Sequence, residues 1–594
     1  MKVGEKKNMK FIFSYLKKYR KLVVTVMIIK FSATLGELML PYVLEHLIDN
    51  IVPQKEVSLI FLWGAVMVLL AVAVRQANVK ANRLSVRVAK ESTFEIRRDL
   101  FWKSINLSGN QLDEFGLPSL NSRMTSDSYN LQSFIQSFQS LGIRAPIMLL
   151  GGIFITLTMD TGLAFILCII APILITAVVF VSMKGIPLYD KVQQSMDEIV
   201  RIMRENIGGI RVVKALSKEN YEMHRFGGAN DQMVKKDVKA GIVMALPGPI
   251  TTFVLNMGLT IVVIVGAIRV NNGTTKPGVI LAFLTYFNMI LMGVMALNRV
   301  FMLMSKANAS ANRIAAVVST ADELLPISQE KAAVTDREEY IIFDYVNFSY
   351  GRSGEDASAE KFDGKERQKC LEDIHFSMNK GGSLGILGAT GCGKTTIINL
   401  LMRFYDADEG NIFIDGKDVR TYNKDELHRL FGVVFQNDVI FADTLEENIS
   451  FGRNVSAEGI RRAAADAKAQ EFIEGYEDTY SHRAAVHGAN LSGGQRQRVL
   501  IARALAAAPQ ILILDDSSSA LDYKTDAALR KAIREHYADT TTIIVAQRIS
   551  SIMSLDDIIV LDEGKIIGHG THEELMHTCE MYQEIYQMQM GEER

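Results

Sequence analysis

Six apolar stretches, each close to the length that a helix needs to cross a membrane, dominate the first half of this chain. They lie at about 22–44, 57–77, 134–159, 161–183, 241–269 and 277–303. About 20 apolar residues span the hydrocarbon core of a bilayer as a helix. The sequence therefore predicts an all-α domain of six transmembrane helices, with buried helices of a soluble protein as the alternative.

Basic residues between the stretches set the predicted orientation. One side carries Lys17, Lys18, Arg20, Lys21, Arg83, Arg87, Lys90, Arg97 and Arg98, and the opposite connections carry only Lys55, Arg269 and Lys276. The positive-inside rule then places both termini in the cytoplasm of a multi-pass protein of the inner (plasma) membrane. Residues 9–19 mix aromatic and basic positions, which favours an interfacial helix. The long connections 80–130 and 184–239 predict helical hairpins that extend into the cytoplasm.

Charged residues inside the apolar stretches need an explanation. Lys30 and Glu37 are seven residues apart in the first stretch, Arg75 ends the second and Arg144 interrupts the third. A basic group at mid-bilayer costs about 2.5–3.5 kcal/mol unless it is paired or hydrated. Both a water-filled substrate cavity and structural pairing between helices remain open.

The second half of the chain has the composition of a soluble domain. The averages of 48% apolar residues and a net charge of −2 over 594 residues therefore mix two classes of domain. We divide the chain into a transmembrane domain at 1–318, a linker at 319–338 and a soluble domain at 339–594. The segment 351–369 reads as a polar insertion. Four cysteines without metal-ligand spacing support neither a disulfide framework nor a zinc site.

A phosphate-binding loop follows an apolar segment at 383–387. Residues 388–396 read Gly-Ala-Thr-Gly-Cys-Gly-Lys-Thr-Thr, and a helical pattern follows. Strand, glycine loop and helix in this order predict an α/β P-loop domain that binds ATP and magnesium. The loop residues assigned to the nucleotide are Gly388, Gly391, Gly393, Lys394, Thr395 and Thr396, with Lys394 on the β- and γ-phosphates and Thr395 on magnesium.

A second buried strand, 511–515, ends in Asp515. A carboxylate at this place fits the magnesium-associated Walker B position, because a hard cation beside phosphates prefers oxygen ligands. A carboxylate that caps the next helix is the alternative.

With these motifs in place, residues 10–590 resemble an ATP-binding-cassette (ABC) exporter half-transporter. Tyr350 resembles the adenine-stacking aromatic residue, and Gln436 resembles the Q-loop glutamine, which contacts nucleotide and metal. Residues 491–495 (Leu-Ser-Gly-Gly-Gln) resemble the family signature, and 519–522 resemble the D-loop. Within the signature, Ser492, Gly493, Gly494 and Gln495 are assigned to nucleotide. The segment 209–215 resembles a helix that docks on a nucleotide-binding domain.

Three positions depart from the family pattern. Asp516 stands where the family usually has the catalytic glutamate, and Gln547 stands where it usually has a histidine. Residues 485–488 read Ala-Val-His-Gly in place of Gly-Glu-Arg-Gly. Asp516 and Gln547 belong to the site built on this chain's own P-loop, and the pair resembles the degenerate subunit of bacterial heterodimeric multidrug exporters.

The resemblance implies a subunit of an exporter of amphiphilic compounds, drugs or lipids, whose own ATP site is slow. Its partner would be a second half-transporter with an intact Walker B glutamate and switch histidine. Membrane lipid is a further partner, and nucleic acid is not. A homodimeric exporter and an ATP-gated sensor without net transport are the alternatives.

Overall fold

The computed structural model describes residues 4–328, 330, 332–351, 369–517 and 520–591. The chain forms two compact units. One contains Met1–Ile105 and Leu120–Ser319, and the other contains Asn106–Ser119 and Thr320–Arg594. The short segment Asn106–Ser119 lies within the residues assigned to the transmembrane domain from sequence, yet it packs with the second unit.

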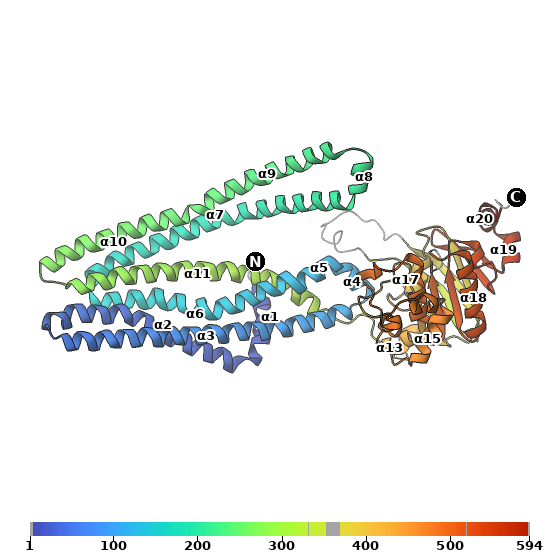
Figure 1. The fold of residues 1–594 in the computed structure, drawn as a ribbon, viewed down its shortest axis with the longest axis horizontal. Helices are drawn as coiled ribbons and strands as arrows, with labels where there is room; N and C mark the ends of the chain where they lie inside the picture. Colours follow the sequence, from blue (N-terminus) through green and yellow to red (C-terminus); the bar gives the residue numbers. More distant parts are fainter. Residues whose placement is uncertain (1–3, 329, 331, 352–368, 518–519, 592–594) are drawn as a thin grey trace. The chain divides into compact units, whose positions relative to one another are not determined.

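The first unit is built mainly of long helices (Figure 1). They are α1 (Gly4–Lys18), α2 (Arg20–His46), α3 (Val57–Ile105), α5 (Leu117–Ser122), α6 (Ser128–Met159), α7 (Thr161–Gly208), α8 (Ile210–Ala215), α9 (Glu219–Ala245), α10 (Pro247–Asn271) and α11 (Pro277–Val318), with α5 at the border of the two units. Helices α3 and α7 continue well beyond their apolar parts without a break.

Five of the predicted spans lie in long apolar helices of the described residues. Among the described residues, five helical stretches are long and apolar enough to cross a membrane: Arg20–Gln54, Val57–Ile105, Leu117–Met159, Glu219–Asn271 and Pro277–Val318. The fourth predicted span lies in α7, which runs from Thr161 to Gly208. The fifth predicted span, 241–269, contains a helix break, because α9 ends at Ala245 and α10 begins at Pro247.

The second unit is built on two sheets. The four-stranded sheet has the order β2-β1-β4-β5, with β1 (Ile341–Phe348), β2 (Leu371–Met378), β4 (Glu409–Ile414) and β5 (Lys417–Asp418), all antiparallel. The six-stranded sheet has the order β10-β9-β3-β8-β7-β6, with β3 (Ser383–Gly388), β6 (Phe431–Val434), β7 (Ile511–Asp515), β8 (Thr541–Val545), β9 (Asp557–Asp562) and β10 (Lys565–Gly570). All its pairings are parallel except that of β9 with β10.

The parallel sheet is buried on both faces, as the apolar runs in its strands require. Along β7, Ile511 and Ile513 pack into one hydrophobic cluster while Leu512 and Leu514 pack into another. Helices complete the unit: α4 (Gly109–Phe115), α12 (Lys394–Leu401), α13 (Lys424–Arg429), α14 (Leu445–Ser450), α15 (Ala457–Asp466), α16 (Gln470–Glu474), α17 (Gly493–Leu505), α18 (Tyr523–His536), α19 (His572–Thr578) and α20 (Glu580–Met590). Because β3, β8 and β7 are neighbouring parallel strands, their carboxyl ends meet at one edge of the sheet.

Candidate functional site: a nucleotide pocket at the edge of the parallel sheet

The glycine loop between β3 and α12 has a backbone that only glycine adopts readily. Gly391 and Gly393 have φ values of 88° and 105°. A Cβ atom on Gly393 would also lie 2.5 Å from a side-chain carbon of Leu371. Gly393 is the residue before the first turn of α12, so the free N–H groups of that turn face the loop. The loop can therefore bind an anion through backbone N–H groups.

A cavity of about 280 Å³ opens over this loop. The residues that line it are Tyr350, Cys370, Thr390, Gly391, Gly393, Lys394, Thr395, Thr396, Gln436, Asp515, Asp516, Val545, Ala546 and Gln547. Ten of these were assigned to the site from sequence. The cavity thus brings together residues from 350 to 547 because the carboxyl ends of neighbouring parallel strands meet there.

Sequence reasoning missed two polar members of the lining. Thr390 lies inside the glycine loop, so the loop pattern could have indicated it. Cys370 directly follows the insertion, where no motif marks it, and its Sγ lies 3.3 Å from Oγ1 of Thr396. Gly388, which was assigned to the nucleotide, is the last residue of β3 and is not among the residues that line the cavity. Its carbonyl oxygen accepts a hydrogen bond from Lys394.

Lys394 and the Thr395–Asp515 pair form the polar floor of the cavity. Nζ of Lys394 donates to the carbonyl oxygens of Gly388 (2.8 Å) and Ala389 (2.6 Å). Oγ1 of Thr395 donates to Oδ2 of Asp515 over 3.0 Å. Burial raises the pKa of Asp515, and the hydrogen bond from Thr395 opposes that shift. Asp515 does not cap the next helix, since Asp522 accepts the capping hydrogen bond of α18.

The hydroxyl and carboxylate oxygens of this pair are the ligand types that Mg²⁺ prefers. Among the described residues, no group of three or more His, Cys, Asp or Glu side chains is placed to hold a metal ion. That finding is compatible with Mg²⁺, because magnesium usually takes one or two protein oxygens together with substrate phosphates. The donor set fits a nucleotide-bound magnesium ion.

Asp516 lies between two amide side chains at the rim of the cavity. Its Oδ2 accepts hydrogen bonds from Nε2 of Gln436 (3.4 Å) and from Nε2 of Gln547 (3.3 Å). Burial raises the pKa of Asp516, while the positive charges of Lys394 and Arg548 oppose the shift. The structure therefore joins two of the three positions that depart from the family pattern, because Gln547 donates to the carboxylate of Asp516.

Tyr350 forms the aromatic wall of the cavity. Its hydroxyl donates to Oγ1 of Thr396 (3.1 Å) and accepts from Nδ2 of Asn399 (3.3 Å). Its ring meets Phe348 and Tyr405 edge to face, with centroid separations of 4.9 and 5.1 Å. The ring is therefore held in a fixed orientation at the cavity wall.

The signature segment begins α17. Oγ of Ser492 accepts from the backbone N of Gln495 (3.2 Å), and the backbone N of Ser492 donates to Oε1 of Gln495 (2.8 Å). This capping box uses the Gln495 side chain within its own helix. Of the described residues that line the cavity, none belongs to 491–495. The helix start presents free N–H groups at Gly493 and Gly494, and this chain's own pocket does not use them. Ser519 of the D-loop lies outside the described residues.

Helix α4 packs against the nucleotide-binding unit beside Tyr405. The backbone N of Gly109 donates to the carbonyl of Phe404 (3.0 Å), and the Tyr405 hydroxyl donates to Oδ2 of Asp113 (2.9 Å). The side chain of Gln111 donates to the carbonyl of Ala321. The sequence did not predict this contact. It joins the segment Asn106–Ser119 to the loop that follows α12.

A Gly109→Val variant is expected to lower the transport obtained per ATP hydrolysed about tenfold. The physical reason is steric, because a Cβ at Gly109 would lie 2.4 Å from the Tyr405 ring and 2.8 Å from the Phe404 carbonyl. Transport and ATPase activity would be measured on the same proteoliposomes. Gly64→Val is the control, since a Cβ there meets nothing within 4 Å. Unchanged coupling in Gly109→Val would contradict a role for this contact.

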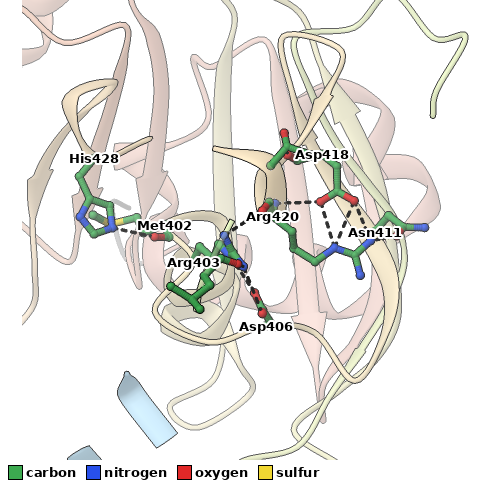
Figure 2. Close-up of polar contacts among 9 residues, drawn as sticks. Met402, Arg403, Asp406, Asn411, Asp418, Arg420 and His428 are labelled. Carbon is green, nitrogen blue, oxygen red and sulfur yellow. Dashed lines mark hydrogen bonds and ion pairs between the residues drawn. The ribbon is translucent and has the colours of Figure 1, made fainter. Parts of the chain in front are cut away.

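A buried polar network holds the loop on which α4 docks (Figure 2). Arg403 donates to Asp406 (2.9 Å), to the carbonyl of Arg420 (3.0 Å) and to the carbonyl of Leu325 (3.0 Å). Arg420 in turn pairs with Asp418 over 2.6 Å. Burial would raise the pKa of Asp418, but the hydrogen bonds from Arg420 hold it below its usual range. The network therefore ties the segment after the first unit to the docking loop.

His428 gives this loop a pH dependence. Its Nε2 lies 3.0 Å from the carbonyl of Met402, and its ring meets the Phe404 ring edge to face. Burial lowers the pKa of His428 below its usual value near 6.5. The neutral form is thus favoured by folding, so its contribution to stability is complete above about pH 6.5. It is lost as the pH falls towards the folded-state pKa.

We expect the unfolding temperature of the nucleotide-binding unit to fall between pH 7 and pH 5, and His428→Gln to flatten that fall. Differential scanning fluorimetry of the full-length protein would measure both. His569→Gln should have the opposite effect. The hydrogen bond to Asp557 raises the pKa of His569, so this residue stabilises the fold at low pH. Equal pH profiles for all three proteins would contradict the assignment.

The comparisons with known proteins agree with this site and fold. Residues 23–295 match the ABC transporter transmembrane region, and residues 371–519 match the ABC transporter family. The chain is 33% identical over 582 residues to the ABC transporter ATP-binding protein YfiB of Bacillus subtilis, with 98% of both chains covered. It is 32% identical over 579 residues to the ABC transporter ATP-binding protein Rv1273c of Mycobacterium tuberculosis, with 96% of both covered.

Among solved structures, a bacterial Atm1-family ABC exporter with ATP bound has the same fold. Its TM-score is 0.78 at 23% identity, with 98% of this chain and 99% of that chain covered. The chain belongs to the ABC transporter family. It combines one helical transmembrane region with one ATP-binding domain that couples ATP hydrolysis to transport, in the arrangement of an ABC exporter half-transporter.

Proposed function

We propose that this chain is one subunit of a heterodimeric exporter that moves amphiphilic compounds, drugs or lipids, out of the cytoplasm. Its own pocket binds ATP firmly and hydrolyses it slowly. The observation that carries the proposal is the contact of Asp516 with the amides of Gln436 and Gln547 inside the nucleotide pocket. Both unusual residues act on the same hydrolytic step.

The chemistry of these side chains supports slow hydrolysis. Aspartate is one methylene shorter than glutamate, so its carboxylate lies roughly 1 Å further from an attacking water, and such a displacement can cost about 100-fold in rate. An amide such as that of Gln547 can donate a hydrogen bond but cannot carry a proton. The remaining groups, Lys394, Thr395 and Asp515, retain the chemistry needed to bind ATP with Mg²⁺.

A partner subunit follows from the position of the signature. Since residues 491–495 do not line this chain's cavity, the free N–H groups at the start of α17 are available to a phosphate held by another chain. Helix α8, which the resemblance assigns to docking on a nucleotide-binding domain, is exposed over most of its length. Since the slow pocket lies on this chain, we expect the hydrolytic residues on the partner: a Walker B glutamate and a switch histidine. The partner's signature, which would complete the slow pocket, is expected to be altered.

The test is purification of the tagged full-length chain from its native membrane, followed by sequencing of the protein that co-purifies. The expected result is a second half-transporter with the residues named above, and low ATPase activity for this chain alone. A homodimer of this chain with rapid ATP hydrolysis would contradict the proposal. ATP-dependent accumulation of an amphiphile in inverted vesicles would separate an exporter from a sensor, which would bind substrate without net movement.

A further inference from the structure

A polar network joins α2, α3 and α6. Nζ of Lys30 donates to the side-chain oxygens of Asn78 (2.7 Å) and Asn82 (3.2 Å). Nδ2 of Asn78 donates to Oε1 of Glu37 (2.8 Å), and Nε of Arg144 donates to Oε2 of the same carboxylate (3.0 Å). The three helices are thereby linked through one chain of hydrogen bonds.

Lys30 and Glu37 lie within the first predicted span, whereas Asn78 and Asn82 follow the end of the second, 57–77. Lys30 is ten residues after the start of α2 at Arg20, which corresponds to about 15 Å along the helix. The Lys30 side chain is buried, with 4% of the residue exposed. Arg75, the fourth charged residue noted in these stretches, is exposed and contributes no contact to the network. The charge of the network therefore depends on Lys30, Glu37 and Arg144.

Two positive side chains share one carboxylate. Glu37 pairs with Arg144 over 3.0 Å, and Lys30 contacts it only through Asn78. Structural pairing alone would favour equal numbers of opposite charges, because an uncompensated charge in a membrane is costly. Amide oxygens solvate the ammonium group of Lys30 without neutralising it. With all three groups ionised, the network carries one surplus positive charge.

Arg144 is the member that a ligand can reach. About 35% of its side chain is exposed, compared with 17% for Glu37. A guanidinium group has five N–H donors, and Glu37 occupies only those of Nε and Nη2. The remaining donors suit a carboxylate or phosphate group, which guanidinium binds with high directional preference. When an anion contacts Arg144, Lys30 balances the charge of Glu37 through Asn78.

We propose that Arg144, with Lys30 behind it, recognises the anionic group of a transported amphiphile, so that the preferred substrates combine a carboxylate or phosphate with an apolar tail. This inference rests on the proposed transport function, and it specifies the class of substrate. It does not depend on which nucleotide pocket hydrolyses ATP. The anionic group can belong to a free amphiphile or to a membrane lipid.

Binding of a fluorescent amphiphile without ATP tests the proposal. The probe is 11-(dansylamino)undecanoate, and its uncharged methyl ester is the matched control ligand. The full-length protein, with the subunit that co-purifies, would be placed in phosphatidylcholine nanodiscs. Arg144→Gln is expected to weaken binding of the carboxylate about tenfold and leave the ester nearly unchanged, since one charge-assisted interaction is lost. Lys30→Met should also weaken binding of the carboxylate probe and leave binding of the ester nearly unchanged.

Glu37→Gln distinguishes recognition from a structural role. Glutamine keeps an oxygen for Asn78 and removes the charge that competes for Arg144, so the carboxylate probe should bind several-fold more tightly. If the network were only structural, all three variants would bind both the carboxylate and the ester more weakly. That result, or equal binding of both probes by the wild-type protein, would overturn the proposal.

Competition identifies the source of the anion. Displacement of the probe by phosphatidylglycerol would indicate a lipid substrate, and displacement by dodecanoate alone would indicate a free amphiphile; both results support the proposal. Because no ATP is present, a failure here leaves the slow-pocket proposal intact. Conversely, rapid ATP hydrolysis by a homodimer would contradict that proposal without changing the binding results.

Discussion

A Gly493→Asp variant is expected to lower ATP hydrolysis by the assembled transporter at least about 100-fold. The carboxylate would stand at the first position of α17, where our account places the γ-phosphate held by the partner subunit. The fold should tolerate the change, because a Cβ at Gly493 meets only the Cβ of Ala520, at 3.7 Å. An aspartate at a helix start even stabilises the helix. The loss would therefore come from repulsion of phosphate.

Steady-state ATPase activity and photolabelling with azido-ATP would measure this effect on each subunit separately. Nucleotide binding to this chain's own pocket should persist in Gly493→Asp, since residues 491–495 do not line that cavity. Gly493→Ala is the matched control and should retain most of the activity. If both variants lost activity equally, the effect would be steric, and if neither did, this signature would not serve the hydrolytic site.

The double variant Asp516→Glu with Gln547→His is expected to raise hydrolysis in this chain's own pocket about 100-fold. The longer side chain advances the carboxylate towards the attacking water, and histidine restores a group that can carry a proton. Single-turnover hydrolysis in the assembled transporter, with the partner's catalytic glutamate replaced by glutamine, isolates this pocket.

Two controls accompany the double variant. Asp516→Asn should hydrolyse ATP in this pocket about as slowly as the unchanged chain, because the aspartate is already a poorly placed base. Lys394→Ala in the double-variant background should abolish the gain, because it removes the positive charge from the phosphate site. No acceleration in the double variant would mean that hydrolysis in this pocket is limited by something other than these two side chains.

Several elements could be predicted from sequence because their signals are local. The strands 383–387 and 511–515 and the glycine loop between β3 and α12 were found where predicted. Ser492 is the N-cap residue of α17, which begins at Gly493. Each of these depends on residues close together in the chain, such as an apolar run that ends in a glycine or a carboxylate. The fold class, a helical transmembrane domain followed by a P-loop domain, is confirmed.

Features that depend on distant parts of the chain were not predictable in the same way. The docking of α4 relies on Phe404 and Tyr405, almost 300 residues further along, and no local pattern in 106–119 indicates it. The contact of Gln495 with the backbone of Ser492 in a capping box depends on its side-chain conformation. The partners of Lys30 on α3 could not be identified, because periodicity gives a helix face and not the facing residue.

The most direct test of the slow-pocket account is the nucleotide found on each subunit during turnover. The assembled transporter would be photolabelled with radioactive azido-ATP while hydrolysing, the subunits separated, and the ratio of ATP to ADP determined on each. The account predicts that this chain carries mainly ATP while the partner carries mainly ADP. Equal amounts of ADP on both subunits, or a second copy of this chain in the partner's place, would contradict it.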